Sequence, residues 1–247
     1  INFKVYREVE GCDALELARV CEEVGREFGV RIAVCPPMTE LGSVARAVGL
    51  PVLSQNVDPR APGSSTGWVT PSMVRSAGAA GSLINHSEHR IQPRSIEECV
   101  DLCKGSELIT VICADTVKMS SQVAAFRPDF VAVEPPELIG GDVSVTTANP
   151  RIVENTVEAV KSVSHGTSVL CGAGIKTGKD VRTALDLGAD GVLLNTGIAG
   201  AADPIRMARA MRLAAESGYH AFAAGRISKK LYATASSPTE GVVALQN

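Results

Sequence analysis

The sequence predicts an α/β fold, a single (β/α)8 barrel with a C-terminal extension, and three observations support this prediction. Eight short runs rich in Val, Ile, Leu and Ala recur along the 247 residues. Each run is continuously apolar rather than alternating, as expected of parallel strands that are buried on both faces. An amphipathic stretch follows each run, so strands and helices alternate as they do around a closed parallel sheet.

The predicted strands are spread over most of the chain. They occupy residues 1–6, 31–35, 51–54, 81–85, 108–113, 130–133, 168–171 and 191–195. An open doubly wound sheet is the alternative fold. No Gly-x-Gly-x-x-Gly follows the first run, which counts against the dinucleotide-binding version of that sheet.

Helices are predicted between these strands. Residues 12–28 carry an apolar stripe among charged residues, which is typical of a helix packed on a core. Three later helices are each predicted to begin at a capping residue. These are Asn149 followed by Pro150, Thr177 with its helix running to Leu187, and Asp203 followed by Pro204.

Composition limits the classes of partner. The net charge is -3 and the isoelectric point about 5.9, so neither a nucleic-acid partner nor an anionic membrane surface is expected. The seven cysteines are scattered and odd in number, and no signal-peptide pattern opens the sequence, so we expect reduced thiols in a cytoplasmic protein. Cys99 and Cys103 have a suggestive spacing, but two further metal ligands are missing from the pattern.

Three reactive side chains stand near the ends of predicted strands. In a parallel barrel those ends meet at one mouth, so Lys4, His86 and Glu134 are expected to converge there. Each residue alone also fits a bland role, such as a solvated charge or a strand end. Together they suit proton abstraction next to a carbonyl: Glu134 takes the proton, His86 polarises the carbonyl oxygen, and Lys4 offsets the developing negative charge. This chemistry requires no metal and no cofactor.

The last two predicted strands end in residues suited to binding an anion. Gly172, Ala173 and Gly174 follow the seventh strand, and Thr196 and Gly197 follow the eighth. Unobstructed backbone N–H groups at these two ends occupy the usual phosphate position of such barrels. The substrate is therefore expected to be a small phosphorylated carbonyl compound.

The motifs resemble the triosephosphate isomerase family, in its short archaeal-like form, over roughly residues 1–197. The similar segments are Asn2-Phe3-Lys4, Asn85-His86-Ser87-Glu88-His89-Arg90 and residues 134–140. The resemblance implies interconversion of D-glyceraldehyde 3-phosphate and dihydroxyacetone phosphate, with Lys4 as the electrostatic residue, His86 as the neutral electrophile and Glu134 as the base. It also implies a lid over residues 135–140, a phosphate contact from the Gly140 amide, and supporting positions for Asn2 and Glu88.

Residues 58–68 resemble the third loop of the same family. In that family the loop reaches into the neighbouring subunit and braces its active site. The resemblance therefore implies a homodimer or a homotetramer assembled through the loop around Ser64 and Thr66. A flexible Gly/Ser turn is the alternative interpretation of this segment.

Beyond the eighth strand the sequence resembles the end of a bacterial thiazole synthase, another (β/α)8 barrel. The segments that carry this likeness are Asn195-Thr196, residues 198–201, Asp203-Pro204, residues 207–211, residues 224–227 and residues 236–241. We therefore expect a chimera within one barrel, isomerase-like over about 1–190 and synthase-like over about 190–247. Gly197 departs from the alanine usual in thiazole synthases.

Three functions are compatible with this composite. The first is a working triosephosphate isomerase. The second is a phosphate-binding chimera with little or no catalysis, because a phosphate displaced by about 1 Å can cost on the order of 100-fold in rate. The third is a thiazole synthase, which needs a Schiff-base lysine on an earlier strand. No such lysine motif appears before residue 190, which disfavours the third function.

Overall fold

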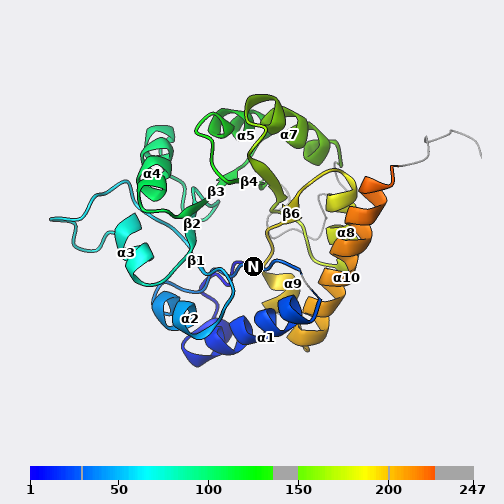
Figure 1. Ribbon diagram of the computed structural model, residues 1–247, viewed down its shortest axis with the longest axis horizontal. Helices are drawn as coiled ribbons and strands as arrows, with labels where there is room; N and C mark the ends of the chain where they lie inside the picture. Colours follow the sequence, from blue (N-terminus) through cyan, green and yellow to red (C-terminus); the bar gives the residue numbers. More distant parts are fainter. Residues whose placement is uncertain (29, 136–149, 200, 226–247) are drawn as a thin grey trace, which may run out of the picture.

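A computed structural model of the chain describes residues 1–28, 30–135, 150–199 and 201–225. Within them, six parallel strands form one sheet whose spatial order follows the sequence. The strands are β1 (Leu53–Ser54), β2 (Gly81–Ile84), β3 (Ile109–Ala114), β4 (Phe130–Val133), β5 (Ser168–Cys171) and β6 (Gly191–Val192). Figure 1 shows them curving around a common centre, with the helices outside.

Two short segments near the N-terminus complete the ring. Asn2 pairs with Cys35, and Val34 pairs with Val52, in two isolated parallel bridges. The Asn2 N–H also donates to the Leu194 carbonyl at 3.0 Å, which joins the first segment to the end of the last strand. The predicted (β/α)8 barrel, a TIM barrel, is confirmed.

Four of the predicted strands are much shorter than expected. Residues 1–6 contribute one isolated bridge and residues 31–35 contribute two, while residues 51–54 and 191–195 contribute the two-residue strands β1 and β6. The first segment stops at Lys4 because its φ of 56° lies in the left-handed region, which a strand cannot contain. A 3-10 helix, η1 (Arg7–Val9), follows at once.

Helices cover the outside of the ring. They are α1 (Cys12–Phe28), α2 (Leu41–Ala47), α3 (Pro71–Ser76), α4 (Pro93–Gly105), α5 (Val117–Ala124), α7 (Pro150–Val163), α8 (Gly178–Asp186), α9 (Thr196–Ala199) and α10 (Pro204–Ala223). The predicted starts at Thr177 and Asp203 are confirmed, since both side chains cap their helices, and Thr177 forms a capping box with Asp180. Asn149 lies outside the described residues. No helix among those described is both long and apolar enough to cross a membrane.

The barrel has an inner and an outer apolar core. The inner cluster fills the ring with small and branched side chains from successive strands, including Leu53, Leu83 and Leu193. The outer cluster packs the strands against the helices. All seven cysteines are free, and six are buried. Burial raises the pKa of the Cys35 thiol to about 11, so this thiol remains protonated at neutral pH.

Helix α10 closes the barrel by lying against α8 and α1 (Figure 1). Its fit on α8 is tight at Gly218, where an added Cβ would lie 2.4 Å from the Arg182 carbonyl oxygen. On its other side, Arg209 donates to Glu27 at 3.0 Å, which ties α10 to α1. The helix is therefore an integral wall of the barrel up to Ala223.

We expect Gly218→Ala to lower the free energy of unfolding by about 1–3 kcal/mol, the usual cost of overpacking. The added methyl group meets backbone, not a flexible side chain, so α10 must move away from α8. Urea denaturation followed by circular dichroism measures the change. Gly105→Ala at the end of α4 is the matched control, because an added Cβ there meets nothing within 4 Å. Equal stability of both variants would contradict the tight fit.

Candidate active site

A cavity of about 120 Å³ opens where the strands end. It contains seven of the predicted site residues: Asn2, Lys4, His86, Glu134, Gly172, Ala173 and Gly174. They come from the first segment and from the loops after β2, β4 and β5. Segments that are distant in sequence thus meet at the carboxyl edge of the ring, as the barrel topology requires.

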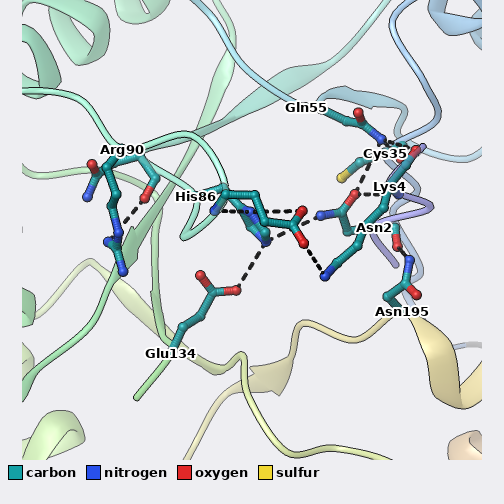
Figure 2. A network of polar contacts seen from close by, with 10 residues as sticks. Asn2, Lys4, Cys35, Gln55, His86, Arg90, Glu134 and Asn195 are labelled. Carbon is teal, nitrogen blue, oxygen red and sulfur yellow. Dashed lines mark hydrogen bonds and ion pairs between the residues drawn. The ribbon is translucent and has the colours of Figure 1, made fainter. Parts of the chain in front are cut away.

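His86 follows β2 and is 8% exposed. The backbone N–H of Glu88 donates to its Nδ1 at 3.2 Å, so Nδ1 is the unprotonated acceptor nitrogen. The ring is therefore neutral, with its proton on Nε2. That nitrogen lies 3.5 Å from Glu134 Oε1, facing the cavity (Figure 2). The local chain thus sets both the tautomer and the direction of the imidazole.

Asn2 lies on the other side of His86. Its Oδ1 accepts hydrogen bonds from the Lys4 N–H at 2.9 Å and from Gln55 Nε2 at 3.4 Å, which turns its Nδ2 toward His86. Asn2 Nδ2 and His86 Nε2 are 3.5 Å apart. Two N–H donors therefore stand side by side at the cavity, where one ligand oxygen can accept from both.

Lys4 occupies the edge of the same cavity. Its Nζ donates to Glu88 Oε1 at 2.7 Å, and its side chain is 20% exposed. The backbone at Lys4 is held in its left-handed conformation by Gln55, whose Nε2 donates to the Lys4 carbonyl at 2.7 Å. The ammonium group is thus fixed within reach of the cavity (Figure 2).

Glu134 follows β4 and is 3% exposed. Burial raises the pKa of its carboxyl above the ordinary glutamate value, and the neighbouring His86, a Cys113 hydrogen bond, the Ser87 backbone and Arg90 only partly oppose this effect. Its Oε2 is buried and has no hydrogen-bond partner among the described residues. An ionised carboxylate with a raised pKa and a vacant oxygen is suited to accept a proton.

The loop after β5 forms another part of the cavity lining. A Cβ on Gly172 would lie 2.7 Å from Glu134 Cγ, so only glycine leaves room for the carboxylate. Gly174 has a φ of 68°, in the left-handed region that glycine adopts without strain. Gly197 lies behind this loop, where a Cβ would meet the carbonyl oxygens of Lys176 and Ile175 at 3.2 and 3.4 Å.

The remaining predicted residues lie around the cavity. Glu88 contacts it through Lys4, while Thr196 and Gly197 are absent from its lining and begin α9. Gly140 and most of the predicted lid, 135–140, fall outside the described residues, as does the tail 228–247. Sequence reasoning missed several lining residues: Ser87, Ile175, Lys176, Leu193, Leu194 and Asn195.

Gln55 is a second omission, although it stands directly after the predicted strand 51–54. The strand-end rule that found His86 would have found it too. No group of three or more His, Cys, Asp or Glu side chains among the described residues is placed to hold a metal ion. The cavity instead offers a carboxylate, a neutral imidazole, an ammonium group and exposed backbone, a set suited to moving a proton next to a carbonyl.

Comparison with known sequences gives a consistent result. A family model described as triosephosphate isomerase matches residues 1–211. The triosephosphate isomerase of Methanothermus fervidus is 48% identical over 198 residues, covering 80% of this chain and 89% of the relative. That of Methanopyrus kandleri is 49% identical over 206 residues, covering 83% of this chain and 91% of the relative.

Comparison with solved structures agrees on the fold. The crystal structure of triosephosphate isomerase from Bartonella henselae superposes with a TM-score of 0.67. The match covers 85% of this chain and 97% of that chain, at 19% sequence identity. At that identity the likeness concerns the barrel alone.

Proposed function

The chain belongs to the triosephosphate isomerase family, and we propose that Glu134, His86 and Lys4 carry out its isomerisation at the barrel mouth. The reaction interconverts D-glyceraldehyde 3-phosphate and dihydroxyacetone phosphate. The observation that carries the assignment is the buried Glu134 Oε2, which has no hydrogen-bond partner within the described part of the chain and belongs to the same cavity as His86, Asn2 and Lys4.

In this proposal Glu134 removes a proton from the carbon next to the substrate carbonyl. The electrons of the broken C–H bond form the enediolate, and negative charge develops on the former carbonyl oxygen. His86 Nε2–H and Asn2 Nδ2–H donate to that oxygen, and the Lys4 ammonium offsets its charge. The hydroxyl proton on the other carbon of the enediolate moves to the former carbonyl oxygen, and Glu134 returns its proton to the former carbonyl carbon. No metal or cofactor takes part.

We place the substrate phosphate against the backbone of Gly172, Ala173 and Gly174. Gly174 is in a left-handed conformation, and Gly197 allows the start of α9 to approach the same loop. The amides of Thr196 and Gly197, and that of Gly140 from the resemblance, complete the proposed set. The lid over 135–140 would exclude water from the enediolate and so suppress loss of phosphate.

We further propose a homodimer or homotetramer in the cytoplasm. The loop between β1 and α3 extends away from the barrel (Figure 1), and it contains the exposed residues Ser64 and Thr66. Trp68 is 43% exposed and Met73 57% exposed, which supplies apolar surface for a neighbouring subunit. The free cysteines are compatible with a reducing compartment.

We also propose that the C-terminal part, about 190–247, derives from a barrel like thiazole synthase. The family model ends at residue 211, and the Methanothermus and Methanopyrus relatives align with 198 and 206 residues of this chain. The segment after Met211 lies outside the family match, and its likeness to the end of a thiazole synthase supports this proposal. Because the family model includes residues 190–211, the isomerase pattern persists across the proposed junction.

A coupled assay of the purified chain tests the function. We expect turnover in both directions without added metal or cofactor, and inhibition by 2-phosphoglycolate in competition with substrate. Absence of turnover together with intact binding of 2-phosphoglycolate would instead identify a phosphate-binding chimera without catalysis. An imine trapped by borohydride with deoxyxylulose phosphate would favour the synthase.

A further inference from the structure

Asn85, the residue that precedes His86, has an unusual backbone conformation. Its φ is 62°, in the left-handed region that most side chains avoid and that asparagine tolerates better than most. It is also 5% exposed, so its polar side chain is buried at the end of β2. A buried residue in this conformation persists only where its surroundings hold it in place.

The Asn85 side chain is held by two hydrogen bonds in different directions. Its Nδ2 donates to the Cys113 carbonyl on β3 at 2.9 Å, and its Oδ1 accepts from the Ile91 N–H at 3.0 Å. Arg90 also binds Asn85: its guanidinium donates to the Asn85 carbonyl at 3.2 Å. Asn85 thus links both ends of the loop that carries His86.

This loop is what directs the imidazole. Glu88, whose N–H fixes the unprotonated Nδ1 of His86, lies inside the span from Asn85 to Ile91. A second turn bond joins the His89 N–H to the His86 carbonyl at 2.8 Å. Opening the loop at Asn85 therefore releases the group that sets the tautomer and the direction of Nε2.

The hydrogen bond from Asn85 to β3 also fixes the position of His86 relative to Glu134. Asn85 binds the Cys113 carbonyl, while the next carbonyl on β3, that of Ala114, accepts from the Glu134 N–H at 2.7 Å. Two successive peptide groups of one strand thus anchor the two sides of the site. The separation between the His86 side and the Glu134 side of the site is therefore set by strand β3 and not by the loop.

We propose that Asn85 is a positioning residue that holds the neutral His86 imidazole in register with Glu134, an inference that rests on the proposed function. It does not touch the substrate. Its loss displaces the electrophile and leaves the phosphate loops intact, so kcat falls and KM changes little.

Asn85→Asp is the sharpest test. Aspartate has the same size and tolerates the same φ, and it keeps an oxygen for the Ile91 N–H, but it places a second oxygen against the Cys113 carbonyl. A displacement of about 1 Å predicts a loss of kcat on the order of 10- to 100-fold. Asn155→Asp on the exposed side of α7 makes the same chemical change away from the site and is the control.

Nitrogen NMR supplies a readout that a general loss of stability would not move. In the wild-type protein His86 Nε2 should appear protonated and Nδ1 unprotonated, and Asn85→Asp should mix the two tautomers. Asn85→Gly, which adopts the same φ without strain and loses both side-chain bonds, should give the same kcat loss and the same mixing. It serves as the second variant if the aspartate form folds poorly.

Failure of the positioning role and failure of the proposed function give different results. Unchanged kcat and an unchanged His86 spectrum in folded Asn85→Gly would overturn the positioning role, even while Glu134→Gln is inactive. Full activity of Glu134→Gln and His86→Ala would overturn the proposed function itself, whatever the Asn85 variants do.

Discussion

Glu134→Gln lowers kcat by about 1,000-fold, within the range that general base catalysis contributes, and leaves KM nearly unchanged. Glutamine fills the same space beside Gly172 but cannot take a proton at the position of the buried Oε2. Steady-state assays in both directions measure the loss. Glu158→Gln on the exposed face of α7 is the matched control and should keep full activity. A Glu134→Gln variant with more than about a tenth of wild-type kcat would remove Glu134 from the role of base.

The raised pKa of Glu134 predicts two further effects, one on the pH dependence of kcat/KM and one on stability. The base acts only when ionised, so kcat/KM falls as the pH decreases through a pKa that burial places above that of an ordinary glutamate. Ionisation of the buried carboxyl also costs stability above that pKa, because the unfolded chain ionises at the lower, ordinary value. Glu134→Gln should therefore melt at a higher temperature than wild type near neutral pH. The difference should disappear as the pH falls below the ordinary value.

The barrel and the reactive trio could be predicted because both follow from local patterns. Continuous apolar runs identify buried parallel strands, and residues after such strands must meet at one mouth, which placed Lys4, His86 and Glu134. Prediction from apolar runs failed where the backbone conformation depends on tertiary contacts. The first strand was predicted to continue to residue 6, whereas the chain turns at Lys4. The Lys4 carbonyl accepts a hydrogen bond from Gln55, which follows the third predicted strand.

Other features of the site were hidden for a similar reason. The relation between Gly197 and the loop ending at Lys176 is a contact between two backbones, and no periodicity of the sequence encodes it. Asn85 belonged to a motif chosen for its histidine, yet its bonds to Cys113 and Ile91 appear only once the neighbouring strand is in place. Sequence patterns convey which residues are chemically suited to a site. Which residues hold them there is a property of the closed ring.

His86→Ala lowers kcat on the order of 100- to 1,000-fold, the usual cost of removing one donor to a developing oxyanion. The Nε2–H of the neutral ring is one of two donors at the cavity, and Asn2 Nδ2 remains after the substitution, which is why residual activity is expected. His86→Gln restores an N–H donor in the same region and should recover part of the loss. His89→Ala, at an exposed histidine in the same loop, is the control and should keep full activity.

The double variant His86→Ala/Glu134→Gln distinguishes cooperation from independent effects. Base and electrophile act on one transition state, since proton removal by Glu134 is what creates the charge that His86 stabilises. Once either side chain is lost, the other contributes less to stabilising the transition state. The double variant should therefore have nearly the same kcat as the less active of the two single variants. Multiplicative losses would mean that His86 acts on a step separate from proton transfer. In that case His86, whose Nε2 lies 3.5 Å from Glu134 Oε1, would serve only to bind the substrate.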